Sequence, residues 1–310
     1  MRKWTIIMII IAVMCIAAIV YALNYYSQKI PLEEGSIQAF FCPQEACSQK
    51  LLDAIQHANT IHCAFFDIDI PEIISALEEK NAQVIIDADN NAELSFNTDT
   101  RSAYMHDKFC IFDNKIVFTG SMNPTIHDTN ENNNNILVIE SAYLAKNYED
   151  EFQQMWKGNF GRDSAVKHPL LIVNNTLIEN YFCPEDDCEE HIAKALESAH
   201  NSIYFMQFSF TSDVLGNILL EKSKTIEIKG IFEKSQNSQY SEYEKLQQFS
   251  VLDTSSGLLH HKVFIIDNET VITGSMNHSK NGNENNDENV LIIHNTEIAQ
   301  LYVDEFEKLK

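Results

Sequence analysis

The stretch that decides the fold is HDKFCIFDNKIVFTGSMN, His106 to Asn123, which returns as HHKVFIIDNETVITGSMN, His260 to Asn277. Aligned without a gap, the two stretches are identical at 11 of 18 positions. The identical positions are mainly polar: a His, a Lys two residues later, an Asp, and a closing Gly-Ser-x-Asn. A long polar pattern that repeats within one chain predicts two copies of one folding unit.

Each copy predicts a β-hairpin followed by a tight turn. The runs FCIF and IVFT, like VFII and VITG, are rich in β-branched and aromatic residues and flank an Asp-Asn pair, which is a hairpin signal. His and Lys two residues apart on a strand point to the same face, and the Gly-Ser turn brings Ser and Asn back beside them. Each half therefore offers an imidazole, an ammonium, a hydroxyl and a carboxamide, which together suit a phosphoryl group.

This pattern resembles the paired HKD signature of the phospholipase D superfamily. The resemblance covers nearly all of both halves but not the N-terminal segment, and it is strongest to the short nuclease-like branch that includes Zucchini-type proteins. It implies a tandem duplication of class α/β: two similar mixed-sheet α/β sandwich halves, related by a pseudo-two-fold axis so that the two motifs face each other.

The chain outside the motifs also repeats. Residues 40–66 match residues 181–208, and each segment predicts a strand, Cys-Pro, an amphipathic helix and a buried strand. A second helix is expected near residues 71–80 and 214–222. Strands that alternate with helices predict helices flanking a mixed sheet.

The N-terminal residues predict a membrane anchor. Residues 5–23, TIIMIIIAVMCIAAIVYAL, carry no charge and at about 1.5 Å per residue reach roughly the 30 Å of a bilayer core. Arg2 and Lys3 precede them, which favours a cytoplasmic N-terminus and an extracytoplasmic catalytic region. We expect a single uncleaved transmembrane helix. A signal peptide cleaved near Val20-Tyr21-Ala22 is the alternative.

These observations divide the chain into five segments. They are the anchor 1–23, a tether 24–35, the first phospholipase D-like half 36–157, a linker 158–175 with Gly158, Gly161 and Pro169, and the second half 176–310.

The charge balance argues against broad binding of nucleic acid. The formal net charge is −23, and only three arginines occur in 310 residues. Dedicated nucleic-acid binders usually show a basic stripe, which is not visible here. A local cationic pocket remains compatible with this composition.

Four cysteines stand at matched positions in two Cys-Pro-x-x-x-Cys segments: Cys42, Cys47, Cys183 and Cys188. Outside the cytoplasm such pairs oxidise, so we expect two local disulfides. One structural zinc held by all four thiolates is the alternative. Cys63 and Cys110 lie in strand-like runs, where we expect ordinary core residues.

The chemistry implied by the resemblance is a two-step displacement at phosphorus through a phosphohistidine. The candidate catalytic residues are His106, Lys108, Asn123, His260, Lys262, Asn277 and Glu288. The candidate supporting residues are Ser121, Ser275, Asn134, Asp113 and Asp267. No carboxylate cluster or His pair at metal spacing stands beside the motifs, so we expect neither a metal nor another cofactor.

The two halves differ after the Asn-rich loops, where Asn134 stands in the position of Glu288. The resemblance implies that this residue crosses to the other half's histidine, and that the first-half histidine is the nucleophile. Glu288 would then support His106, and Asn134 would orient His260 as the general acid. If each residue served its own half, the roles would reverse. Residues 130–133 are compatible with low-complexity filler.

The sequence therefore predicts a membrane-anchored phosphodiesterase. The resemblance to the nuclease-like branch slightly favours a nucleic-acid substrate over a phospholipid. The alternative is a phospholipase D or a cardiolipin-synthase-like phosphatidyltransferase, and a third hypothesis is an inactive module that binds anions. The expected partners are the phosphodiester and the membrane, with no obligate protein partner.

Overall fold

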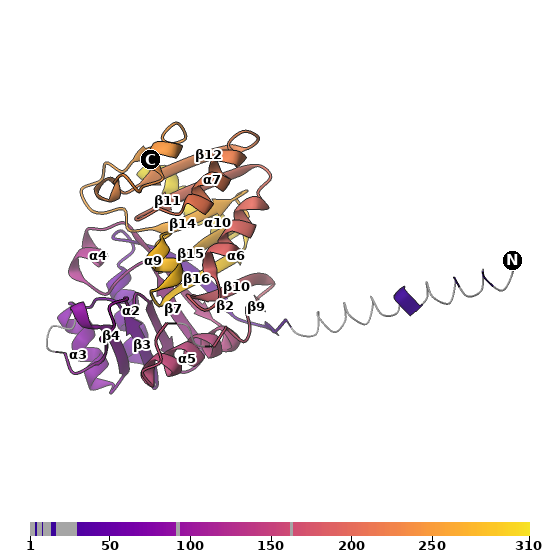
Figure 1. Ribbon diagram of the computed structural model, residues 1–310. Helices are drawn as coiled ribbons and strands as arrows, with labels where there is room; N and C mark the ends of the chain where they lie inside the picture. The colour runs from indigo at the N-terminus through magenta and orange to yellow at the C-terminus, as the bar shows by residue number, and fades with distance from the viewer. Residues whose placement is uncertain (1–3, 5–7, 9–13, 17–29, 91–93, 162–163) are drawn as a thin grey trace.

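The computed structural model describes residues 4, 8, 14–16, 30–90, 94–161 and 164–310. Within them the chain forms two mixed sheets with helices on their faces (Figure 1). The first half, indigo to magenta, lies beside the second half, orange to yellow.

The first half follows the strand–helix alternation that the sequence predicts. Its strands are β2 (Ser36–Cys42), β3 (Ile61–Phe65), β4 (Gln83–Asp87), β5 (Asn97–Asp99), β6 (Lys108–Phe112), β7 (Ile116–Gly120) and β8 (Asn134–Glu140). Its helices are α2 (Cys47–His57), α3 (Pro71–Glu79), α4 (Ile126–Asn130) and α5 (Ala142–Trp156), with a 3₁₀ turn at Ala88–Asn90.

The second half repeats these elements in the same order and adds one short helix, α8 (Tyr243–Leu246), before its fourth strand. Its strands are β10 (Thr176–Cys183), β11 (Ser202–Gln207), β12 (Glu227–Phe232), β13 (Ser250–Leu252), β14 (Lys262–Ile266), β15 (Thr270–Gly274) and β16 (Glu288–His294). Its helices are α6 (Cys188–Glu197), α7 (Asp213–Lys222), α8 (Tyr243–Leu246), α9 (Lys280–Glu284) and α10 (Thr296–Leu309), with a 3₁₀ turn at Lys234–Gln236.

The strand orders of the two sheets confirm the duplication. The first sheet runs β2-β8-β7-β6-β3-β4-β5, and the second runs β10-β16-β15-β14-β11-β12-β13. Each position in one order corresponds to the equivalent element of the other half. The motif strands β6 and β14 lie in the middle of their sheets, so the motif residues are placed by hydrogen bonds on both sides.

One hydrophobic core joins the two halves. It contains side chains from both sheets together with α5 and α10, while separate cores lie beneath α2 with α3 and beneath α6 with α7. Tyr148 of α5 packs edge-on against Phe182 of the second half, with ring centroids 5.0 Å apart. Tyr302 of α10 makes the reciprocal contact with Phe41, also at 5.0 Å. Burial of large aromatic rings in this position stabilises the pairing of the halves.

The hairpin signal and the motif glycines have the local structure that they predict. Asp113 and Asn114 have φ values of 52° and 52°, as a two-residue hairpin turn of this type requires. Gly120 has a φ of 147°, and a Cβ there would lie 2.2 Å from the Asn135 carbonyl oxygen. Only glycine allows this approach, which brings the end of β7 against the start of β8.

The N-terminal anchor lies mostly outside the described residues, which include only positions 4, 8 and 14–16 of the expected span. In the part of the chain that the structure describes, no helix combines the length and apolar character needed to cross a bilayer.

The expected tether and linker differ from the structure at their ends. β1 (Leu32–Glu33) lies within the tether range and pairs in parallel with β9 (Leu170–Val173), which lies within the linker range. Both strands extend the second sheet beyond β10. Main-chain hydrogen bonds that a sequence pattern does not reveal therefore place both segments at a sheet edge.

The cysteines form three disulfides among the described residues. Cys42–Cys47 and Cys183–Cys188 confirm the two expected pairs, each opening a helix. The zinc alternative requires free thiolates and does not fit these bonds. The expectation that Cys63 and Cys110 are ordinary core residues is wrong, because they face each other across β3 and β6 and are bonded.

Candidate active site

The two motif histidines are brought together by a reciprocal exchange between the halves. The main-chain N–H of His106 donates to the carbonyl of Asp287 at 3.0 Å, and that of His260 donates to the carbonyl of Asn133 at 2.9 Å. The chain before each motif thus pairs with the chain before the last strand of the other half. This reciprocity is the pseudo-two-fold relation that the resemblance implies.

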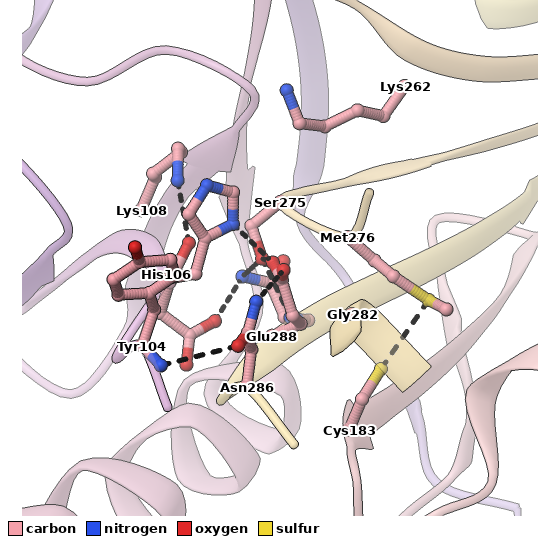
Figure 2. A network of polar contacts seen from close by, with 12 residues as sticks. Tyr104, His106, Lys108, Cys183, Lys262, Ser275, Met276, Gly282, Asn286 and Glu288 are labelled. Atoms are coloured by element: carbon pink, nitrogen blue, oxygen red, sulfur yellow. Dashed lines mark hydrogen bonds and ion pairs between the residues drawn. The ribbon is translucent and has the colours of Figure 1, made fainter. Parts of the chain in front are cut away.

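His106 contacts a carboxyl group from the other half. Its Nδ1 lies 2.8 Å from Glu288 Oε2, which also accepts from the hydroxyl of Ser275 at 2.7 Å (Figure 2). Burial, and then the charges of Lys108 and Lys262, lower the pKa of His106 well below its usual range. Burial raises the pKa of Glu288 to about 8. A proton on Nδ1 shared with Glu288 leaves the lone pair on Nε2, so Nε2 is the atom that can attack a substrate.

His260 makes the matching contact with an amide. Its Nδ1 lies 2.8 Å from Asn134 Oδ1, which accepts from the hydroxyl of Ser121 at 2.8 Å. The Nδ2 of Asn134 donates to the carbonyl of Asp128 at 3.0 Å, so the amide oxygen must face the ring. His260 therefore donates from Nδ1 and presents Nε2 to the pocket. As expected, Glu288 and Asn134 each contact the motif histidine of the other half.

The two lysines lie close to both motif histidines and to each other. Lys108 and Lys262 are each 1% exposed, and each donates to the carbonyl of its own motif histidine, at 2.6 and 2.8 Å. In Figure 2 the amine of Lys262 points toward the side of the site on which His106 lies. Burial lowers the pKa of Lys108 to about 8, and burial and then Lys108 lower that of Lys262. Buried cations in this arrangement would be stabilised by a bound anion.

The remaining predicted residues separate into two groups. Asn123 and Asn277 stand at equivalent positions of the two motifs, and their Oδ1 atoms have no hydrogen-bond partner among the described residues. Each Nδ2 group carries two N–H donors, and Asn123 uses one of them on Asp128 Oδ2 at 2.7 Å, so the other can donate to a phosphoryl oxygen. Asp113 and Asp267 do not enter the pocket. Asp113 Oδ1 accepts from the main-chain N–H of Thr60 at 2.8 Å, and Asp267 Oδ1 accepts from that of Ser202 at 2.8 Å. They tie the hairpin turns to neighbouring strands.

An aromatic ring flanks each histidine, which the sequence reasoning missed. The Phe66 ring lies 4.8 Å from the His106 ring, and the Phe208 ring lies 4.7 Å from the His260 ring. Each ring also lies about 5 Å from the amine of its own half's lysine, at 5.2 and 5.0 Å. Their matched positions at the ends of β3 and β11 were visible in the alignment of the halves.

The Asn-rich loop before β8 is part of the site. Asn132 and Asn133 are buried, and Asn132 Nδ2 donates to Asp128 Oδ1 at 2.7 Å. The interpretation of these two residues as low-complexity filler is wrong. Asp128 itself, the carboxylate that organises this loop, was not among the predicted site residues. The sequence feature that points to Asp128 is its difference from Gly282, which occupies the equivalent position of the second half.

A second layer of crossing contacts lies behind the histidines. Asn289 Nδ2 donates to Asp107 Oδ1 at 2.6 Å, and His261 Nδ1 lies 3.1 Å from Asn135 Oδ1. Both pairs join opposite halves. His261 is fully buried between the halves.

Comparison with known proteins extends these observations. The family model described as "Cardiolipin synthase, PLD-like domain" matches residues 72–156 and 192–310. A protein of Rickettsia typhi named phospholipase D is 31% identical over 149 residues, which are 46% of this chain and 72% of that protein. A Xenopus tropicalis protein named mitochondrial cardiolipin hydrolase is 26% identical over 162 residues, 47% of this chain and 72% of that protein.

A solved structure shows the same fold over most of the chain. The phosphatidylserine synthase of Haemophilus influenzae superposes with a TM-score of 0.62 at 12% identity, covering 88% of this chain and 86% of that one. A match over this share of both chains shows a shared overall fold.

Proposed function

Since this chain belongs to the phospholipase D superfamily and is a phosphodiesterase, we propose that it hydrolyses a phospholipid through a covalent phosphohistidine on His106. The contact of His106 with Glu288 carries the assignment of the nucleophile, because the ionised form of this carboxyl at Nδ1 stabilises the positive charge that the ring gains on attack.

In the first step, Nε2 of His106 attacks phosphorus and forms the N–P bond. The P–O bond to the leaving alcohol breaks, and protonated His260 gives its proton to that oxygen. In the second step, water attacks phosphorus and gives a proton to His260, and the N–P bond breaks. Lys108, Lys262 and the two pocket asparagines would stabilise the non-bridging oxygens throughout.

The choice of phospholipid rests on two observations. The relatives are named phospholipase D and cardiolipin hydrolase, and the net charge of −23 disfavours long-range attraction of a polynucleotide. Nucleic acid, which the resemblance to the nuclease-like branch favoured, becomes the alternative. Transfer of the phosphatidyl group to an alcohol uses the same intermediate, and the description of the matching family supports testing it.

The proposal extends to location. A transmembrane helix over residues 1–23 would hold the catalytic region at the surface of its substrate, outside the cytoplasm. The disulfides support an oxidising compartment. Protease digestion of intact cells should remove the catalytic region and spare a short N-terminal fragment. Full protection of the catalytic region would contradict this topology.

The test of function uses the full-length chain in detergent. Phosphatidylglycerol, cardiolipin, single-stranded DNA, RNA and bis(p-nitrophenyl) phosphate are each supplied, with and without added glycerol, and His106→Ala is the matched control. Release of phosphatidic acid by the wild-type chain alone supports the proposal. Cleavage confined to DNA or RNA would show that the substrate is a nucleic acid. A phosphatidyl product that forms only with glycerol would show that the reaction is transfer to an alcohol.

The nucleophile is tested by quenching with labelled substrate without acid and mapping the phosphohistidine. We expect the label on His106, and slower labelling in Glu288→Gln. Label on His260 in the wild-type enzyme would reverse the two roles.

A further inference from the structure

We propose that Asp128 is a positioning residue that favours the protonated, proton-donating form of His260, by supplying from α4 the carboxylate that Asn134 does not provide. This inference deepens the proposed function and rests on the assignment of His260 as general acid.

The first observation is an exchange of carboxylates between the halves. Counted from the last motif residue, Asn134 corresponds to Glu288, and Asp128 corresponds to Gly282. Each loop therefore directs one carboxyl group at a motif histidine, but from different positions. The second half could not carry a carboxylate at position 282 without backbone movement, because a Cβ at Gly282 would lie 2.2 Å from the carbonyl oxygen of Asn277.

The second observation is the position of the Asp128 carboxylate. Its Oδ2 lies 3.5 Å from Nδ1 of His260, the atom that also contacts Asn134 at 2.8 Å. The ring nitrogen is thus shared between a neutral amide at hydrogen-bond distance and a charged carboxylate just beyond it. His106 differs, because the group from the other half at hydrogen-bond distance from its Nδ1 is the carboxyl of Glu288, at 2.8 Å.

The third observation is how firmly Asp128 is held. Its Oδ2 accepts from the main-chain N–H of Asn123 at 2.9 Å and from Asn123 Nδ2 at 2.7 Å. Its Oδ1 accepts from Asn132 Nδ2 at 2.7 Å, and its own N–H donates to the hydroxyl of Thr125 at 3.2 Å. The side chain is 5% exposed. Hydrogen bonds of this number favour the ionised form of a buried carboxyl.

The charges around His260 explain why a carboxylate is needed there. The ring faces Lys262 on β14, Lys108 on β6, His106 of the first motif and Asp128 on α4. Burial and then Lys262 lower the pKa of His260, and of these four neighbours only Asp128 opposes them. Burial alone would raise the pKa of Asp128, but His260 and the bonds from Asn132 and Asn123 lower it to about 2. Asp128 is therefore charged at neutral pH.

The two carboxyl groups accordingly have different tasks. Burial raises the pKa of Glu288 to about 8, which suits a partner that exchanges charge with His106 during attack. Asp128 keeps a permanent negative charge beside His260, which favours the imidazolium that must exist before the leaving alcohol is protonated. The asymmetry of the two loops thus divides the roles of the two histidines.

The direct test is a titration of the histidine rings by NMR in the full-length chain, with His260→Ala identifying the His260 signal. Asp128→Asn keeps the shape of the side chain and removes its charge. We expect the pKa of His260 to fall by about one unit, the lower end of the effect of an opposite charge at this distance. Glu288→Gln is the matched control and should move the signal of His106 more than that of His260.

The kinetic test uses the leaving group. An alkyl alcohol needs protonation as it leaves, whereas p-nitrophenol does not. Asp128→Asn should therefore slow alkyl phosphodiesters by roughly tenfold or more, a fraction of the usual contribution of a general acid, and p-nitrophenyl esters much less. Asp128→Asn/Asn134→Asp, which returns a carboxylate to His260 from the symmetric position, should recover most of the loss.

These outcomes separate the inference from the proposed function. An unmoved His260 signal with equal losses on both leaving groups would overturn the inference and reduce Asp128 to an anchor for Asn123. A fall in the His260 pKa supports the contact even if phospholipid proves to be the wrong substrate. A thermal melt shows whether Asp128→Asn is folded, and the double variant supplies the answer if that single variant is not.

Discussion

At the scale of the residue, the site depends on which histidine has which partner. His106 and His260 occupy equivalent places in two similar motifs, yet one contacts the carboxyl of Glu288 and the other the amide of Asn134. Identical rings thereby receive different electrostatic surroundings. The two serine hydroxyls hold these partners in place, at 2.7 Å from Glu288 and 2.8 Å from Asn134.

The first prediction is that the two histidines act as one unit. His106→Ala and His260→Ala should each lower kcat by about a thousandfold or more, and the double variant should be little worse, because residues of one catalytic unit are not additive. Initial rates with a phospholipid, whose leaving alcohol needs a proton, measure this. Half of the activity in each single variant would instead indicate two independent sites.

The second prediction concerns the binding of anions by Lys108. Burial lowers its pKa to about 8, so the amine carries its charge below that pH and loses it above. Affinity for tungstate, a stable tetrahedral dianion, should fall by about tenfold between pH 7.5 and pH 9 as the charge is lost. Isothermal titration calorimetry measures the affinity. Lys108→Met should bind weakly at both pH values, and a wild-type affinity that rises with pH would refute the argument.

At the scale of the element, the loops that follow each motif build the pocket as much as the motif strands do. α4 and the Asn-rich segment before β8 carry Asp128, Asn132 and Asn134, and their main chain pairs with the chain that leads to His260. The Cys42–Cys47 disulfide lies against the end of the first motif. Met122, next to Asn123, lies with its sulfur 3.7 Å from Cys42 Sγ.

The third prediction is that the three disulfides differ in their contribution to stability. Cys63–Cys110 spans 47 residues, and Cys42–Cys47 spans 5. Loop-closure entropy assigns about 4 kcal/mol to the longer loop and about 2 kcal/mol to the shorter. Removing Cys63–Cys110 by paired Ala substitution should therefore lower the free energy of unfolding more than removing Cys42–Cys47.

Denaturant unfolding of the two paired variants measures this difference. Mass spectrometry of the unreduced chain should also show the loss of two hydrogens for each disulfide. Free thiols at Cys63 and Cys110 would remove the basis of the comparison.

At the scale of the molecule, the halves are joined by polar contacts as well as by the shared core. One group is strongly acidic: Glu151 of α5 faces Glu185, Asp107 and Asp287. Burial and then the charge of Glu185 raise the pKa of Glu151, and burial raises that of Glu185. In the first half, Gln44 occupies the position of Glu185, so the equivalent region carries less charge.

The fourth prediction follows from these carboxyl groups. A carboxyl whose folded pKa is raised is most favourable at low pH, and its contribution to stability is lost as pH rises through the folded pKa. Glu185→Gln should therefore raise the Tm at pH 8 and have less effect, or a small negative one, at pH 5. The comparison of variant with wild type is required because buried histidines with lowered pKa values change stability in the opposite direction.

Scanning calorimetry at the two pH values checks the result. The exposed Glu244→Gln is the control and should show no such dependence. A Tm difference for Glu185→Gln that is equal at pH 5 and pH 8 would contradict the shared burial of these groups.

The sequence alone determined the duplication, the alternation of strands and helices, the hairpins, and the histidines, lysines and asparagines of the site. These properties are local, because hairpin turns, helical periodicity and motif spacing depend on neighbouring residues. Two of the disulfides were also predictable, since five positions separate their cysteines.

Only the tertiary structure decided which residues meet across the interface. The Cys63–Cys110 bond requires the antiparallel register of β3 and β6, and the edge strands β1 and β9 depend on main-chain pairing between distant segments. The sequence did not reveal the role of Asp128, because that role depends on the packing of α4 beside His260, which lies 132 positions further along the chain. The effect of a charge on its neighbour depends on the distance between them in space and on their burial, and the spacing of two residues in the sequence gives neither.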